Sequence, residues 1–281
     1  MQDQGQREER LKRKLYFYLW VSPDFQTNEA IKVHKACLTK YIDVFDERTF
    51  IVAVDDFRNE AQINEGLSWV KEICGERPFN VKLTLNNKEL CEVGTFGEYF
   101  LPAMEMEERC MMFFSHSKGI MDTNDLWKNK YSVLRWVISM YYYNLEYVDE
   151  AESYLLNGKV FFGALRTQFD RLNNSGIMTH GNIYIGTFYW FNPANAKKNM
   201  IVSLSEMPMA FNRWTAEDFP MLFNIECLSS HNNVVTENTA FDLFYLRKDY
   251  WPLYLNLYGD PDKLFDMQNS IIKDACWVEG Y

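Results

Sequence analysis

A histidine, a hydroxyl and a lysine stand together at the end of an apolar run near the middle of the chain. Residues 110–114 are uncharged and largely apolar, and they lead into His116, Ser117, Lys118 and Gly119. This pattern predicts a buried strand that delivers polar side chains to a loop. The side chains of His116 and Lys118 can both reach one anionic group. A plain polar turn, with Gly119 at positive φ and Lys118 in solvent, fits the same residues and stays open as the alternative.

A second informative stretch runs from His180 to Pro193. It predicts a strand interrupted at Gly186, and a glycine inside a strand usually marks a bulge or a close approach of another group. Aromatic rings follow at once, and rings beside polar donors suit a sugar, whose CH faces stack while its hydroxyls need hydrogen bonds. The same rings fit a hydrophobic core, and the sequence leaves that alternative open.

Carboxylates that suit acid–base chemistry or ligand binding occur at several places, apart from Asp260-Pro261-Asp262, which has the letters of a metal-binding Asp-x-Asp motif but fits a turn before a helix better. Asp55 and Asp56 close an expected strand, where they could bind a ribose or a metal, or form an ordinary turn. Glu92 precedes the central strand and could enter the pocket. Glu217 lies four residues after Arg213 on an expected helix face, where it could act as a base, grip sugar hydroxyls or make an ordinary ion pair.

The elements that must position these residues alternate between strand and helix. Aromatic and β-branched runs at 15–21, 49–54 and 79–85 predict strands, and apolar periodicity after Thr27 and over 61–74 predicts helices between them. With the strand before His116, this order indicates a parallel sheet with right-handed crossovers. Ligands bind at the carboxyl ends of strands in such sheets, so the loop after the fourth strand is a candidate site.

The second half of the chain has a less regular pattern. Helices are expected over 126–143, 147–156 and 264–275, and strands over 159–163 and 241–247. The first fourteen residues form a charged leader, which is either a solvated end or a contact with an anionic membrane face. Its basic residues, which outweigh Glu8 and Glu9, are Arg7, Arg10, Lys12, Arg13 and Lys14.

Composition argues against several classes of protein. A net charge of -10 and a pI near 5.0 disfavour a nucleic-acid binder. Six scattered cysteines without a Cys-x-x-Cys pair indicate a reduced, intracellular protein, and the absence of a signal peptide or a spanning apolar run predicts a cytoplasmic location. No Gly-x-Gly-x-x-Gly and no Gly-x-Ser-x-Gly are present, which disfavours a Rossmann oxidoreductase and an α/β-hydrolase.

These stretches, in this order, resemble a family of bacterial glycosyltransferase-like proteins encoded in capsule, O-antigen and exopolysaccharide clusters. In that family an aromatic or leucine run precedes His, Ser or Thr, Lys and Gly. A second motif is His, a short spacer, Gly, Asn or Thr, Phe, Trp or Tyr, and Trp. The resemblance covers roughly residues 15–225, with Thr187 where Asn is commoner. The matching residues are Phe113 to Gly119, Arg135-Trp136, Val160 to Gly163, His180 with Gly186 to Trp190, and Arg213 with Glu217.

The resemblance implies a nucleotide-sugar-binding α/β fold of the GT-A kind, with a mostly parallel, Rossmann-like sheet flanked by helices and a helical C-terminal part. After the leader over residues 1–14, residues 15–281 would form one domain, with the nucleotide bound by about 15–120 and the acceptor by about 121–281. The implied reaction moves a sugar from a nucleotide-sugar donor to a growing surface glycan or a lipid-linked glycan. A non-catalytic carbohydrate-binding or scaffold protein of such a cluster is the alternative.

Such an enzyme must neutralise the charge that develops on the diphosphate and deprotonate an acceptor hydroxyl. The usual device is an Asp-x-Asp motif with Mg²⁺ or Mn²⁺. Here His116 and Lys118 stand in that place, so no cofactor is expected, and a divalent metal is the alternative. Glu217 is the expected base, ahead of Glu92 or Asp56. The expected donor-binding residues are Asp55, Asp56, Ser117, Gly119 and Glu92, and the expected acceptor-binding residues are His180, Thr187, Tyr189, Trp190 and Arg213.

Overall fold

The computed structural model describes residues 10–95, 109–117, 137–138, 140–163, 166–172, 178–184, 187–200, 216 and 219–230. These residues form an α/β fold of the Rossmann-like kind around one mostly parallel sheet of seven strands, in the order β3-β2-β1-β4-β8-β5-β9. The strands are β1 (Lys12–Trp20), β2 (Glu47–Val54), β3 (Asn80–Leu85), β4 (Cys110–His116), β5 (Phe161–Gly163), β8 (Tyr189–Phe191) and β9 (Leu228–Ser229).

The first four strands run parallel, as their sequence pattern predicts. β1 pairs with β2 on one side and β4 on the other, and β2 pairs with β3, always in parallel. All seven residues of β4 are buried, because helices or other chain segments cover both faces of a parallel sheet. The mixed part of the sheet is not predicted by the sequence: β8 runs antiparallel to both β4 and β5.

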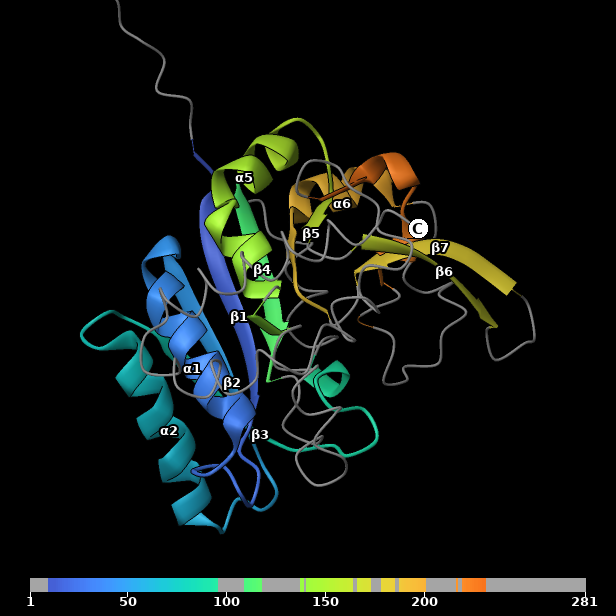
Figure 1. Ribbon diagram of the computed structural model, residues 1–281. Coiled ribbons are helices and arrows are strands. Elements are labelled where there is room, and N and C mark those ends of the chain that lie inside the picture. Colours follow the sequence, from blue (N-terminus) through green and yellow to red (C-terminus); the bar gives the residue numbers. More distant parts are fainter. Residues whose placement is uncertain are drawn as a thin grey trace, which may run out of the picture.

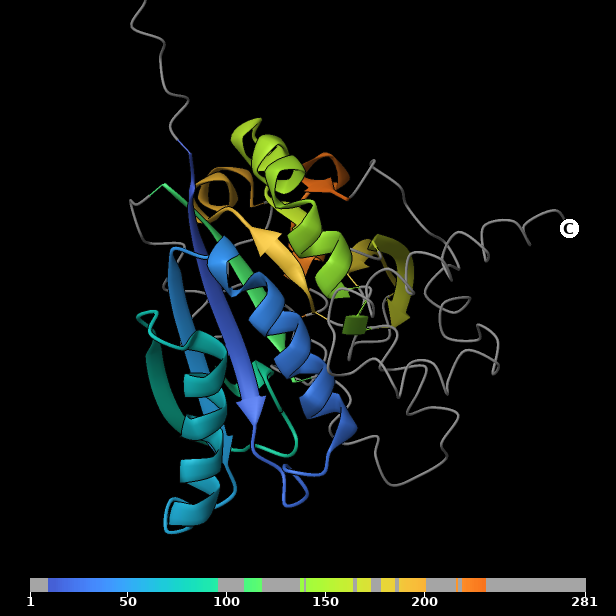
Figure 2. The ribbon, with the colours of Figure 1, turned by 60° about the vertical axis from the view of Figure 1, so that its left-hand side comes forward.

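Three helices cover one face of this sheet (Figure 1). They are α1 (Glu29–Tyr41), α2 (Glu60–Cys74) and α5 (Val148–Leu156). Figure 2 shows the same helices in front of the strands. Asn28 begins α1 by accepting a hydrogen bond from the backbone N–H of Ala30, so the N-cap lies one residue after the expected Thr27. Gly66 lets α2 approach the sheet closely, since a Cβ there would meet Val52 at 2.6 Å.

The opposite face carries shorter elements. α6 (Pro193–Asn199) and the 3-10 turn Phe219–Leu222 contribute Ala196 and Phe219 to a second apolar cluster with Phe114, Phe161 and Tyr189. The other short turns are Ile42–Val44, Tyr142–Glu146 and Ile225–Cys227. In the described parts of the chain, no helix has the length and apolar character that crossing a membrane requires.

The stretch from His180 to Pro193 is not the single interrupted strand that the sequence predicts. Its first part belongs to β7 (Met178–Tyr184), which pairs with β6 (Arg166–Leu172) in a separate two-stranded antiparallel sheet. Its second part is β8, which lies between β4 and β5 in the main sheet. The break marks a change of sheet, with Thr187 at a φ of 61°.

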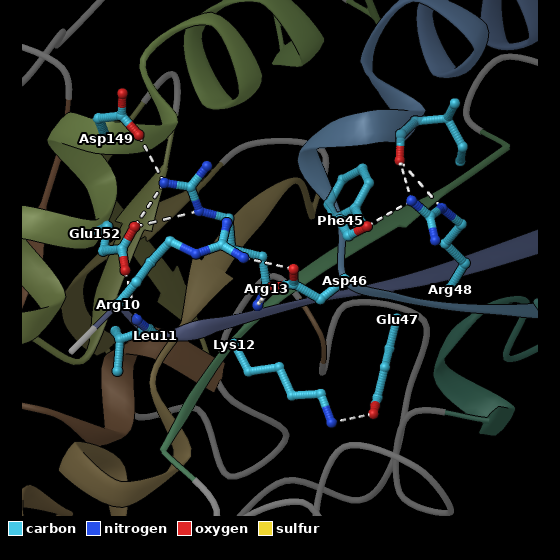
Figure 3. A network of polar contacts seen from close by, with 11 residues as sticks. Arg10, Leu11, Lys12, Arg13, Phe45, Asp46, Glu47, Arg48, Asp149 and Glu152 are labelled. Atoms are coloured by element: carbon cyan, nitrogen blue, oxygen red, sulfur yellow. Dashed lines mark hydrogen bonds and ion pairs between the residues drawn. The ribbon is translucent and has the colours of Figure 1, made fainter. Parts of the chain in front are cut away.

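The start of β1 is held by charged side chains (Figure 3). One guanidinium nitrogen of Arg13 donates to Glu152 and to Asp149, both at 2.6 Å, and Glu152 also accepts from the backbone N–H of Leu11 at 2.5 Å. Burial alone would lower the pKa of Arg13, but the hydrogen bonds to these two carboxylates outweigh it and leave that pKa raised. The buried side chain of Arg13 therefore fixes β1 against α5.

Neighbouring basic residues are paired in the same way. Arg10 contacts Asp46 at 2.5 Å, and Lys12 contacts Glu47 (Figure 3). Lys14 also contacts Glu47. Lys12 to Lys14 thus belong to β1, and the charged leader ends earlier than the sequence predicts. The physical reason is that acids far along the chain neutralise this charge run, which no local pattern reveals.

The structure describes residues 137–138 and 140–143 of the helix expected over 126–143. Val137, Ile138, Met140 and Tyr141 are helical and buried, and Tyr142 and Tyr143 begin a π-helical turn. The expected strand over 241–247 and helix over 264–275 lie outside the described residues.

Candidate functional site

The candidate site lies at the edge of the sheet where β1, β2 and β4 end. β2 and then β3 lie on one side of β1 in the sheet, whereas β4 lies on the other side of β1. The strand order therefore reverses between β1 and β4. In open α/β sheets, ligands bind in the crevice outside the carboxyl ends of the strands at such a switch point. His116 is in register with Tyr18 at this edge.

Ser117 joins the ends of β4 and β1. Its backbone N–H donates to the carbonyl of Tyr18 at 2.8 Å, and its hydroxyl oxygen accepts from the backbone N–H of Trp20 at 3.0 Å. The side chain is buried, and its oxygen is already used within the fold. The hydroxyl of Ser117 also has a proton to donate, and a donor at this position suits an anion.

His116 faces a carboxylate from a distant part of the chain. Its Nδ1 lies 3.6 Å from Oε2 of Glu92, an ion-pair distance slightly longer than a hydrogen bond, and the two side chains are only 9% and 13% exposed. The ring of His116 also contacts Phe188, with 5.7 Å between centroids. The sequence indicates both His116 and Glu92 as site residues but does not predict that they meet.

The segment after β3 is folded so that it presents Glu92. The side-chain oxygen of Asn87 accepts from the backbone N–H groups of Glu89 and Leu90, which makes a tight turn. Cys91 then takes a φ of 49°. Val93 is buried in the cluster that contains Phe114, so the segment is anchored directly beside β4.

A chain of polar contacts links the ends of β1, β2 and β3. Oδ1 of Asp55 accepts from the indole N–H of Trp20 and from the amide of Asn86, each at 3.2 Å. The amide oxygen of Asn86 accepts in turn from the hydroxyl of Tyr18 at 3.2 Å. The carboxylate of Asp55 is thus oriented by two donors although it is exposed. The sequence does not single out Tyr18, Trp20 and Asn86, although each closes or follows an expected strand.

The surroundings of Tyr18 are anionic. Burial raises the pKa of its hydroxyl well above the ordinary value, and the charges of Glu92, Cys91 and Asp55 raise it further. Tyr18 therefore stays protonated and serves as a donor. This edge of the sheet collects negative groups from the loop after β3 and from the end of β2, so a cation beside them is favoured.

For Asp56 the sequence allows either ligand binding or an ordinary turn, and the structure favours the turn. Its carboxylate is hydrogen-bonded by the side chain and backbone of Arg58, which lowers the pKa of Asp56. Arg58 is 91% exposed on its side-chain surface, so the pair faces solvent. We therefore do not carry Asp56 forward as a donor-binding residue.

Thr187 lies where β8 begins, beside the end of β4. The antiparallel register sets Phe114 opposite Tyr189 and so leads Thr187 toward His116. Thr187 is a β-branched residue at positive φ, which is strained, and it is buried. Its hydroxyl has no hydrogen-bond partner in the described structure, and neither does that of Ser115 in β4.

Two residues expected to bind the acceptor are core residues instead. Tyr189 and Trp190 are completely buried. The hydroxyl of Tyr189 donates to the carbonyl of Ala216 at 3.1 Å, and the indole N–H of Trp190 donates to the carbonyl of Asn144 at 2.8 Å. Both rings pack against other rings, so neither offers a face to a sugar. Of the two interpretations that the sequence allowed, the structure favours the core.

The remaining sequence-based candidates are placed only in part. His180 lies in β7, opposite Asp170 in the two-stranded β6–β7 sheet, which is separate from the main sheet. Lys118, Gly119, Arg213 and Glu217 lie outside the described residues. Within the described residues, no group of three or more His, Cys, Asp or Glu side chains is arranged to hold a metal ion.

Comparison of the chain with protein-family models and with curated proteins finds no match. The function has to be argued from the residues at this edge of the sheet.

Proposed function

We propose that this protein is a glycosyltransferase of the GT-A kind that moves a sugar from a nucleotide-sugar donor to a growing surface glycan. One observation carries the proposal. An oriented acid at the end of β2 and an imidazole with a hydroxyl at the end of β4 flank the β1–β4 switch point, where sheets of this strand order bind nucleotides.

The donor can be assigned to this edge by its chemistry. Both hydrogen bonds to Asp55 end on Oδ1, so Oδ2 can accept from the hydroxyls of a ribose. The diphosphate needs positive charge and donors. His116 and the hydroxyl proton of Ser117 supply them at the end of β4, and Lys118, the next residue in the chain, extends the set. In this proposal these side chains act in place of a metal.

Fewer residues are proposed to bind the acceptor than the sequence suggests. Glu217 remains the proposed base and Arg213 and His180 the proposed acceptor-binding residues, on the family resemblance alone. Tyr189 and Trp190 are left out because they are buried. Thr187 stays in the proposal because its position beside β4 and its buried hydroxyl suit a polar contact.

The proposed location is the cytoplasm, and membrane contact is not included. Among the basic residues that suggested it, Arg10, Lys12, Arg13 and Lys14 pair with acids of the same chain. These pairs leave little net positive charge there to attract an anionic surface.

Release of nucleotide from a panel of donors tests the proposal. The panel contains UDP-, GDP-, CMP- and dTDP-sugars, and nucleotide release is followed with and without EDTA. We expect one nucleotide family to be cleaved, slowly by water when no acceptor is present, and to be cleaved in EDTA as well. Lys118→Ala is expected to lower the rate at least tenfold.

Two results would count against the proposal. Activity that EDTA abolishes and Mn²⁺ restores would overturn the metal-independent mechanism. A folded protein that neither cleaves nor binds any donor would overturn the enzyme assignment and favour a glycan-binding or scaffold role.

A further inference from the structure

The pair formed by His116 and Glu92 carries an inference that rests on the proposed function and goes beyond it. Both side chains are largely removed from solvent, and they come from elements separated in sequence: the end of β4 and the segment after β3. A carboxylate or an imidazolium buried alone is costly. Each becomes acceptable when the other is present, provided that the imidazole carries a proton.

The groups around the pair favour the same protonation state. Tyr18 faces His116 across the β1–β4 ladder, and its hydroxyl is in the field of Glu92, Cys91 and Asp55. These groups come from β1, from the segment after β3 and from the end of β2, and when charged all of them are negative. Tyr18 stays protonated and adds no charge, so the negative charge next to His116 is that of Glu92, and it favours a positive charge on His116.

We propose that Glu92 is a positioning residue that keeps His116 protonated, so that His116 binds the leaving diphosphate of the donor as a cation. The carboxylate of Glu92 forms an ion pair with the imidazolium on the Nδ1 side, and Nε2 donates its N–H to an oxygen of the terminal phosphate. During transfer the acceptor oxygen forms a bond to the anomeric carbon, and its proton goes to the base, proposed as Glu217. The bond between the anomeric carbon and the phosphate oxygen breaks, and the electron pair stays on that oxygen beside His116.

A histidine that acts as a cation and a histidine that acts as a base give activity opposite dependences on pH. A cation is needed in its protonated form, so activity is present at low pH and is lost as the pH rises through the titration of His116. A base is needed in its neutral form, so activity would be gained over the same range. The direction of the pH limb that His116 controls thus separates the two roles.

An NMR titration tests the protonation of His116 without any donor. The ring signals of the four histidines are followed with pH, and His116 is assigned from the signal missing in His116→Gln. We expect His116 to lose its proton at a pH about one unit lower in Glu92→Gln than in the wild type. Glu89→Gln removes the same charge from an exposed position on the same segment and is expected to leave the titration unchanged. Equal titration of His116 in the wild type and Glu92→Gln would overturn the proposal.

A pH profile tests the catalytic consequence with the donor that the wild type cleaves. We expect the upper limb of kcat to move to lower pH in Glu92→Gln, with the rate at pH 8 reduced about tenfold and the rate at pH 6 nearly kept. Unchanged far-UV circular dichroism shows that the variant is folded. An unshifted limb, or a rate that rises with pH through the same range, would overturn the role given to Glu92.

The two experiments separate this inference from the function on which it rests. If Glu92→Gln shifts the NMR titration of His116 but the protein cleaves no donor, the glycosyltransferase function is refuted. The effect of Glu92 on the protonation of His116 would then stand, without a role in sugar transfer. A protein that cleaves donors with His116 titrating independently of Glu92 would keep the enzyme and refute the inference.

Discussion

At the residue scale, two buried serines at the end of β4 use their hydroxyls differently. The oxygen of Ser117 accepts from the backbone N–H of Trp20, whereas the hydroxyl of Ser115 has no partner in the described structure. We expect Ser117→Ala to lower the free energy of unfolding by about 1 kcal/mol, because it leaves a donor unpaired. Ser115→Ala should change it by less than about 0.5 kcal/mol. Urea denaturation of both variants checks the contrast, and equal losses would contradict it.

Thr187 offers a test of backbone strain at the site. A left-handed conformation costs a residue with a Cβ about 1–2 kcal/mol, which glycine avoids. Thr187→Gly should therefore be about 1 kcal/mol more stable than Thr187→Ala, the reverse of the usual order for the two residues. Chemical denaturation of the pair measures the difference. A more stable alanine variant would mean that the φ of 61° is not maintained in solution.

Residue types in the sequence predict part of the candidate site. His116, Ser117, Glu92 and Asp55 are recognisable because they are polar and close to expected strand ends. Their partners are not recognisable, since the pairing of His116 with Glu92 depends on how the segment after β3 folds back. The rings of Tyr189 and Trp190 look equally suitable for a sugar and for a core, and only the position of β8 decides between them.

At the element scale, the start of β1 depends on one buried acid from α5. Glu152 binds Arg13 and the backbone of Leu11, so removal of Arg13 leaves a buried carboxylate without its cation. We expect Arg13→Met to lower the free energy of unfolding by about 3 kcal/mol. Arg13→Met with Glu152→Gln should recover at least a third of that loss, because the neutral amide still accepts from Leu11.

Asp149→Asn is the matched control for this network. Asp149 also binds Arg13 but is 91% exposed, so its loss should cost less than about 1 kcal/mol. Urea denaturation of the variants checks the order. A double variant as unstable as Arg13→Met alone would show that packing of the Arg13 side chain, and not charge, holds the strand.

Elements with a strong local pattern are the ones that the sequence predicts. The expected strands at 15–21 and 49–54 and the expected helix at 61–74 match β1, β2 and α2 to within a few residues. The prediction for the stretch from His180 to Pro193 is wrong because the pattern of residue types predicts a strand but not which sheet the strand joins. The start of β1 is three residues earlier than predicted for a related reason, since the acids that accept its basic residues come from α5 and from the region before β2.

At the scale of the whole molecule, the strand order is what turns scattered polar residues into one site. β1 lies between β2 and β4, so residues that are 61 positions apart in sequence, Asp55 and His116, end at the same edge of one sheet. A parallel sheet is predicted by the alternation of strand and helix, but the order of its strands is not. The antiparallel insertion of β8 is a long-range pairing that no local period encodes.

Ligand-induced stabilisation tests the central claim most directly, namely that a nucleotide-sugar binds at the carboxyl edge of this sheet. Melting temperatures are measured with UDP, GDP, CMP and dTDP and their sugar conjugates, with and without Mn²⁺. The proteins compared are the wild type, Asp55→Asn at this edge, and Asp149→Asn at the opposite end of β1. A ligand that binds only the folded state, at a hundredfold excess over its Kd, raises the melting temperature by roughly 5 °C or more. We expect such a rise with one nucleotide family in the wild type and in Asp149→Asn, and a rise less than half as large in Asp55→Asn. No rise with any nucleotide, or an equal rise in Asp55→Asn, would contradict the assignment of the donor to this edge.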